Sequence, residues 1–126
     1  MLTTIVFAMG VGRLVLGLAP FVAVRWSSRL LGVPTAHDNP TSRLMARLFG
    51  VRDAGLGVLV FWALSHPEAL SFVLAFNALT DFADLTAIAV PLVRRQGIDR
   101  AAWTSAALAL PAGIGWLAVL SQVGWR

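Results

Sequence analysis

Five ionisable residues interrupt stretches of the sequence that are otherwise apolar enough to cross a membrane, namely Arg13, Arg52, Asp53, Asp81 and Asp84. Charge inside a bilayer is costly, so such side chains face a protein interior or a water-filled cavity and usually pair with one another. Two interpretations follow from these residue types. They form either a closed arginine–aspartate network that fixes how the helices pack, or a mid-membrane site for a proton, an ion or a ligand.

The composition of the chain places these charges in a membrane protein. Of its 126 residues, 58% are hydrophobic and 13% are charged, whereas a soluble domain carries about 25% charged residues. The net charge is +4, yet most of the arginines flank apolar segments: Arg25, Arg29, Arg43, Arg47, Arg94, Arg95 and Arg100. Arginines at such positions set topology and contact lipid headgroups. We therefore expect the lipid bilayer as a partner and no binding of nucleic acid.

Four segments are long enough to span a bilayer core of about 30 Å, which needs about 20 apolar residues per helix. They lie at about 2–24, 44–64, 69–93 and 101–123. The predicted fold is all-α, a four-helix transmembrane bundle that makes residues 1–126 a single integral membrane domain. The first segment has no basic n-region, and Arg13 interrupts its apolar run, so we expect a retained helix rather than a signal peptide.

The distribution of arginine predicts the orientation of the bundle. The connections after the first and third segments are rich in arginine, whereas the second connection has none. Arginine-rich connections stay in the cytoplasm, so both termini are expected on the non-cytoplasmic side. The lysine-free, alanine-rich and glycine-rich composition suggests a bacterial protein, and hence a multi-pass protein of the bacterial inner membrane.

Turn chemistry predicts where three of the helices begin. Asn39 followed by Pro40 is typical of an N-cap with proline at the first helical position. The stretch from Ser65 to Glu68 fits a capping box, and Asp99 is placed to cap the last helix. The start of the long 26–42 connection is expected to lie flat at the membrane interface.

Helix geometry places the five charges at a common depth. With a rise of about 1.5 Å per residue, Arg13 and Asp81 each lie about 16 Å from the cytoplasmic end of their segments. The other three charges lie at about 12–14 Å. We pair Arg13 with Asp81 and Arg52 with Asp84, which leaves Asp53 as the odd carboxylate and the one expected to be protonated.

Residue spacing predicts which helix faces meet. Asn77, Asp81 and Asp84 are spaced i, i+4 and i+7 and share one polar stripe. The buried polar network is therefore expected to comprise Arg13, Arg52, Asp53, Asn77, Asp81 and Asp84. Small residues lie on the same faces and are the expected helix-packing positions: Gly10 and Gly17 in the first segment, and Ala46, Gly50 and Gly57 in the second. Small residues let helix backbones approach closely in lipid.

Metal and phosphate sites find little support in the sequence. Asp81 and Asp84 form a D-x-x-D pair that resembles a magnesium–diphosphate motif, but a second acidic motif is missing and two arginines share its depth. His37 and His66 lie in connections on opposite sides of the predicted membrane, and there is no cysteine. We therefore predict no metal, no cofactor and no catalytic residue.

The stretch Phe49-Gly50-Val51-Arg52-Asp53-Ala54-Gly55-Leu56-Gly57 resembles the G-[IV]-R-[DE]-x-x-L-G signature of small four-helix membrane proteins grouped as the DUF4267 family. The arginine of the first segment and the aspartates of the third fit the same pattern, and the similarity extends from Gly10 to about Leu120. The family has no assigned function. The resemblance therefore implies membrane residence and a four-helix form, and it marks Arg52 and Asp53 as a pair.

The expected function is non-enzymatic. The glycine faces and the lack of a sizeable soluble part favour a small scaffold or accessory subunit that packs against itself as a homo-oligomer, or against a larger membrane complex. The alternative is a proton- or ion-coupled conduit in which Asp53, Asp81 and Asp84 titrate and Arg13 or Arg52 sets selectivity. An enzyme acting on lipid is a distant third. A dry, satisfied polar layer favours the scaffold, whereas a water-filled path to Asp81 favours the conduit.

Overall fold

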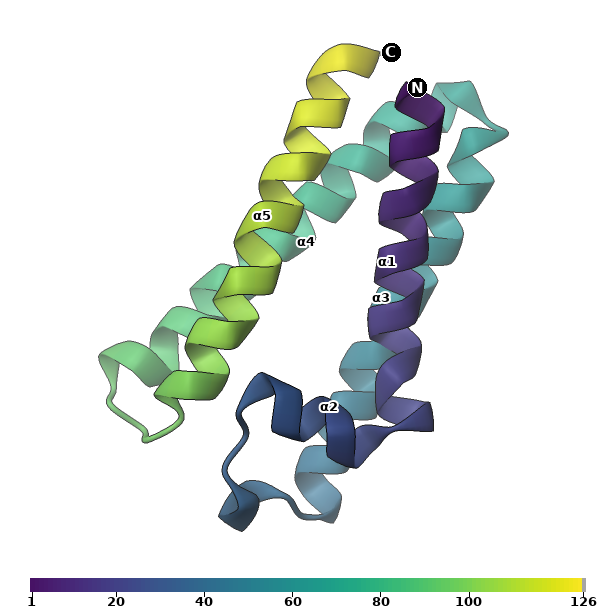
Figure 1. Cartoon of the computed structure of the whole chain (residues 1–126). Coiled ribbons are helices and arrows are strands. Elements are labelled where there is room, and N and C mark those ends of the chain that lie inside the picture. The colour runs from purple at the N-terminus through teal and green to yellow at the C-terminus, as the bar shows by residue number, and fades with distance from the viewer. Residues whose placement is uncertain (126) are drawn as a thin grey trace.

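The computed structural model describes residues 1–125, which form five α-helices and a short 3₁₀ turn and contain no strand (Figure 1). The helices are α1 (Leu2–Val22), α2 (Val24–Leu31), α3 (Pro40–Leu64), α4 (Pro67–Val93) and α5 (Asp99–Val123), with the 3₁₀ turn η1 (Thr35–His37) between α2 and α3. The prediction of an all-α fold is confirmed, and each of the four expected segments coincides with one long helix.

Three of the long helices, α1, α4 and α5, are long and apolar enough to cross a membrane. They mark the chain as a membrane protein. The fourth long helix, α3, has 25 residues but a lower hydropathy, because Arg47, Arg52 and Asp53 all fall within it. Length alone would let α3 span a bilayer, since 25 residues extend about 37 Å at 1.5 Å per residue.

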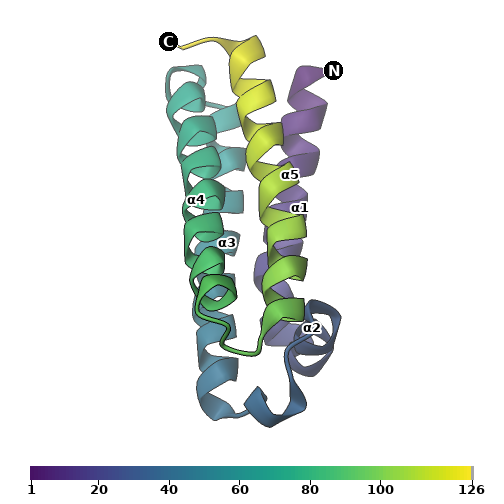
Figure 2. The same cartoon turned by 90° about the vertical axis from the view of Figure 1, so that its left-hand side faces the viewer.

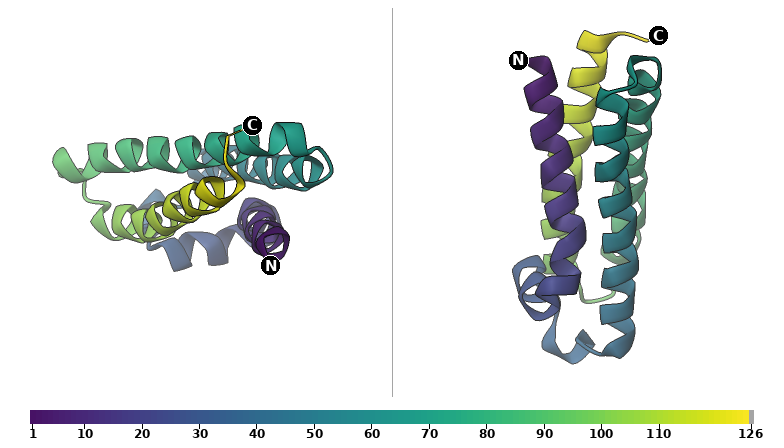
Figure 3. Two further views of the ribbon diagram at one scale, coloured as in Figure 1. Left: turned by 90° about the horizontal axis from the view of Figure 1, so that it is seen from above. Right: turned by 90° about the vertical axis from the view of Figure 1, so that its right-hand side faces the viewer.

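The long helices pack as two pairs, α1 against α3 and α4 against α5 (Figures 1 and 3). A tight turn joins α3 to α4 and connects the two pairs. The pairs lie close together at the end that holds both termini and diverge toward the opposite end (Figure 1). This divergence determines where the cavity described below is found.

The short helix α2 crosses the open end of the bundle and contacts both α1 and α5 (Figure 2). It ends at Gly32, whose φ of 80° lies in the left-handed region that favours glycine. A Cβ atom at Gly32 would also lie 2.6 Å from Cγ of Arg100, so a side chain there would have to displace that of Arg100. At the start of α3, Arg43 Nε donates to Asp38 Oδ1 in the preceding connection at 2.7 Å, and this hydrogen bond lowers the pKa of the Asp38 carboxyl.

One of the three predicted helix starts is confirmed. Asn39 caps α3 by accepting from the backbone N–H of Ser42 at 2.9 Å, with Pro40 at the first helical position. The other two predictions are wrong. The N-cap of α4 is His66, whose ring stacks on Trp62 and bonds the Trp62 carbonyl at 2.8 Å instead of capping. Asp99 lies inside the first turn of α5 rather than at its N-cap, where its charge still favours the helix N-terminus.

A hydrophobic core fills the bundle between the charged residues and the end that holds the termini. Its members come from all four long helices: Val6, Val60, Ala63, Val73, Leu74, Ala78, Trp116 and Val119. Ser71 ties the C-terminal end of α5 to α4, because its hydroxyl donates to the Gly124 carbonyl at 2.8 Å. The half of the bundle that faces α2 has few buried apolar residues by comparison.

Candidate functional site

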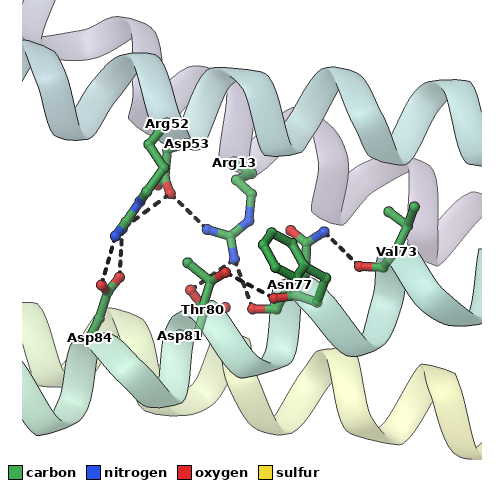
Figure 4. A network of polar contacts seen from close by, with 9 residues as sticks. Arg13, Arg52, Asp53, Val73, Asn77, Thr80, Asp81 and Asp84 are labelled. Carbon is green, nitrogen blue, oxygen red and sulfur yellow. Dashed lines mark hydrogen bonds and ion pairs between the residues drawn. The ribbon is translucent and has the colours of Figure 1, made fainter.

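Arg13 of α1 lies at the centre of the charged layer. Its side chain donates from Nη1 to Asp53 Oδ1 of α3 and from Nη2 to Asp81 Oδ1 of α4, each at 2.8 Å (Figure 4). Nη2 also donates to the backbone carbonyl of Asn77 at 3.3 Å. The Trp116 ring of α5 is centred 5.7 Å from the guanidinium carbon. One guanidinium thus contacts every other long helix, since its planar fork serves two carboxylates at once.

A second ion pair joins α3 to α4 beside the first. Arg52 binds Asp84 with both of its terminal nitrogens, at 2.9 Å and 2.7 Å (Figure 4). The Arg52 guanidinium carbon lies 4.5 Å from the centre of the Phe49 ring. The Arg52 side chain is 40% exposed, whereas that of Arg13 is 7% exposed. The Arg52–Asp84 pair therefore lies at the exposed edge of the layer, and Arg13 with its two carboxylates forms the buried centre.

The predicted partners Arg13–Asp81 and Arg52–Asp84 are both present, but the prediction that Asp53 is the odd carboxylate is wrong. Asp53 shares Arg13 with Asp81, and its Oδ1 also lies 3.8 Å from Arg52. The prediction assigned one carboxylate to each arginine. A guanidinium offers five N–H donors, so a single buried arginine can hold two carboxylates from two helices.

Three buried polar atoms of the layer have no hydrogen-bond partner within the described chain: Arg13 Nε, Asn77 Oδ1 and Asp81 Oδ2. Asn77 is fully buried and uses only its amide N–H, which donates to the Val73 carbonyl at 2.9 Å. Asp81 is 4% exposed. A buried polar atom without a partner is costly and calls for an explanation such as a ligand or a water molecule. The charged groups of the layer are therefore paired with one another, whereas these three atoms lack a hydrogen-bond partner within the described chain.

A cavity of about 970 Å³ adjoins the charged layer. At the layer it is lined by Arg13, Asp53, Asp81, Asp84 and Trp116, and from there it extends between the two helix pairs to α2. Hydroxyl groups line the far end, on Ser27, Ser28, Ser42, Thr104 and Ser105. The walls between are apolar and include Leu16, Ala46, Ile88, Leu108 and Ala109. This volume lies within the range of about 300–1,000 Å³ that is typical of small-molecule sites.

A second hollow is a weaker candidate. It measures about 340 Å³ and is lined by Trp103, Ala106, Ala107, Leu110 and Pro111, all of which belong to α5. A groove along one outer helix face, without a charged lining residue, is ordinary for a surface that contacts lipid. The large cavity is the stronger candidate because five helices and a charged layer build it.

Four of the five predicted packing residues lie in the α1–α3 contact. A Cβ atom at Gly17 would overlap the backbone nitrogen of Ala54 and lie 2.6 Å from the Gly50 carbonyl oxygen. A Cβ atom at Gly57 would lie 3.0 Å from the Gly10 carbonyl oxygen. Gly10 and Gly17 of α1 therefore bracket Arg13 just as Gly57 and Gly50 of α3 bracket Asp53. The fifth predicted residue, Ala46, lines the cavity instead.

Among residues 1–125, no group of three or more His, Asp or Glu side chains is placed to hold a metal ion. His37 lies in η1 and His66 at the start of α4, at opposite ends of the bundle. The arrangement is suited instead to holding helices together and to binding a molecule beside a charged layer.

Sequence reasoning missed two features of the site. Trp116 was not among the predicted site residues, but its ring lies over the Arg13 guanidinium and lines the cavity. The cavity itself was not predicted, because its alanine and leucine walls have the same composition as lipid-facing surface. The pairing of Arg13 with Asp53 did leave a signal. In each helix the charge stands between two glycines seven residues apart, and antiparallel packing brings the two charges together.

Comparison with known proteins gives one result. No curated protein and no solved structure shows significant similarity to the chain. One family model does match, described as a domain of unknown function, DUF4267, and it covers residues 10–120. The match runs from the first packing glycine of α1 to the end of the core-forming part of α5, and so includes every charged residue of the layer. The chain belongs to the DUF4267 family.

Proposed function

We propose that this protein is a non-enzymatic, four-span protein of the bacterial inner membrane that binds a small amphipathic molecule between its helix pairs. The single observation that carries the proposal is the cavity of about 970 Å³, which has a charged layer at one end, hydroxyl groups at the other and apolar walls between them. Such a lining suits a molecule with a polar group and an apolar body, because a few polar groups orient the ligand within an apolar site.

In this proposal α3 is the fourth membrane span. The two charges in the middle of α3 are engaged within the bundle, since Asp53 binds Arg13 and Arg52 binds Asp84. The lipid then meets exposed apolar side chains of α3 such as Val58 and Trp62. The arginine-rich end that carries α2 faces the cytoplasm, by the positive-inside rule, and both termini lie on the other side.

Filling the cavity is expected to abolish binding of a small apolar probe. N-phenyl-1-naphthylamine is uncharged and becomes fluorescent in apolar sites, and we expect it to bind the detergent-solubilised protein saturably. Ala109→Trp places an indole ring in the cavity from α5 and is expected to remove the saturable fluorescence.

The matched control is Ala118→Trp, on an exposed position of the same helix outside the cavity. It adds the same ring and is expected to leave binding unchanged. Circular dichroism checks that both variants remain helical. If both variants bind the probe as the parent protein does, the cavity is not a binding site.

A scaffold or accessory subunit is the second candidate, and the closed ion pairs favour it. Each of the five charged residues of the layer has an opposite charge within 4 Å, so the layer can serve packing alone. This role predicts that chemical crosslinking in native membranes yields a defined homo-oligomer or a constant heteromeric partner. A protein that stays monomeric and copurifies with nothing would count against it.

The conduit interpretation shares the cavity, since Asp53, Asp81 and Asp84 all line it. The hydrophobic core stands between the layer and the end that holds the termini. Conduction therefore requires a second conformation in which that core opens. Binding needs no such change, and we favour it for that reason.

A further inference from the structure

The charge of the layer indicates which kind of molecule the cavity takes. The layer combines two guanidinium groups with three carboxylates, and so has one net negative charge when every group is ionised. Arg13 is the one basic residue of the described chain that lines the cavity, and both of its terminal nitrogens are already bound to carboxylates. An anion entering the cavity would meet one N–H of Arg13 without a partner, at Nε, but Asp53 and Asp81 already balance the charge of that guanidinium.

Asp81 offers the complementary feature. It lines the cavity, is 4% exposed, and uses Oδ1 to accept from Arg13. Its second oxygen, Oδ2, is buried without a hydrogen-bond partner. Asp84 lines the cavity as well. This carboxylate oxygen is buried and has no donor, and the layer around it carries excess negative charge. A cationic group is therefore stabilised more beside Asp81 Oδ2 than elsewhere in the cavity.

Trp116 supplies an aromatic surface at the same end of the cavity. It is 2% exposed and lines the cavity beside the layer. Aromatic rings attract organic cations through their quadrupole, and tryptophan does so most strongly. The remaining walls are apolar and the far end carries only neutral hydroxyl groups. The ligand therefore has its charge at one end and an apolar body over most of its length.

We infer that the cavity binds a lipophilic organic cation, an amine or quaternary onium with apolar substituents, with its charged group beside Asp81 and Trp116. This inference rests on the proposed function, since it names the class of ligand that the same cavity takes. It goes beyond that function by fixing the sign of the ligand's charge and the residue that selects it.

Two probes of matched shape and opposite charge test the inference. Tetraphenylphosphonium and tetraphenylborate are each titrated against N-phenyl-1-naphthylamine bound to the detergent-solubilised protein. Only the fluorescence that Ala109→Trp removes is counted, so that partition of the ions into micelles does not enter. If Ala109→Trp does not fold, Ala46→Phe fills the same cavity from α3. We expect the phosphonium to displace the probe at a concentration at least about tenfold lower than the borate does.

The second arm removes the selecting charge. Asp81→Asn keeps the side-chain shape and is expected to weaken phosphonium binding about tenfold or more, because truncating one partner of a buried charge pair costs over a decade in affinity. Asp84→Asn, which is less buried, is expected to act in the same direction and serves if Asp81→Asn does not fold. Asp99→Asn, a carboxylate outside the cavity, is the matched control and is expected to leave binding unchanged.

The outcomes separate the inference from the proposed function. Equal displacement by both ions, or a preference for the borate, overturns the inference while the cavity remains a binding site. Unchanged phosphonium binding in both aspartate variants also overturns it. If the parent protein shows no cavity-dependent fluorescence at all, the proposed function fails and the inference fails with it.

Discussion

Replacing Arg13 with leucine is expected to cause the largest loss of stability of any single substitution in the layer. The change removes the shared partner of Asp53 and Asp81, and both carboxylates are almost fully buried. Breaking a buried ion pair by removing one member costs about 3–5 kcal/mol. We expect a loss of at least this size in the free energy of unfolding, measured by titrating the protein in mixed micelles with sodium dodecyl sulfate and following circular dichroism.

Two further variants show whether charge or volume is responsible. Arg13→Lys keeps the positive charge but has one compact ammonium group in place of the fork, so we expect it to hold one carboxylate and to recover only part of the stability. Arg13→Leu combined with Asp53→Asn and Asp81→Asn leaves no unpaired buried charge, and we expect it to be more stable than Arg13→Leu alone. A triple variant no more stable than the single one would contradict the ion-pair explanation.

Much of the charged layer could be predicted from the sequence because helix geometry is regular. A rise of about 1.5 Å per residue and an orientation based on arginine counts were enough to place Arg13 and Asp81 at one depth. The structure joins these two residues at 2.8 Å. Depth does not determine how each helix is rotated about its axis, however. The rotation of α3 against α1, which turns Asp53 toward Arg13, depends on the glycine contact on either side.

The cavity could not be predicted because it depends on the angle between the two helix pairs. Hydropathy measures how strongly a residue avoids water. An alanine in the cavity wall has the same hydropathy as an alanine that faces lipid. Ala46 shows the difficulty. It shares a helix face with Gly50 and Asp53, so spacing placed it among the helix-packing residues. Ala46 lies where the α1–α3 pair has diverged from the α4–α5 pair, and it lines the cavity instead.

The boundaries of α4 and α5 show a similar limit. Their capping signals were read from residue types at Ser65 and Asp99, yet the helices begin after His66 and Ile98. Capping preferences are local, and several polar residues near a helix end compete for the cap. At Asn39 the signal was correct because Ser42 completes a reciprocal pair of hydrogen bonds with it.

Gly17→Ala is expected to destabilise the protein through the α1–α3 contact, where close backbone approach leaves no space for an added methyl group. The added carbon meets backbone atoms of Ala54 and Gly50 rather than a flexible side chain, so the two helices must move apart. Overpacking of this kind costs about 1–3 kcal/mol. Separation of α1 from α3 also lengthens the Arg13–Asp53 contact, which now measures 2.8 Å, and we expect the loss to fall toward the upper end of that range.

The controls are two glycines of the same helices that face away from the contact. A Cβ atom at Gly12 or Gly55 has no neighbouring atom within 4 Å, and replacing a helical glycine with alanine otherwise stabilises by about 0.5–1 kcal/mol. We therefore expect Gly12→Ala and Gly55→Ala to raise the free energy of unfolding slightly in the same detergent titration. If Gly17→Ala behaved as these two do, close backbone approach would not be what holds α1 to α3. The position of Asp53 beside Arg13 would then need another cause, since the glycine contacts are what bring those two backbones together.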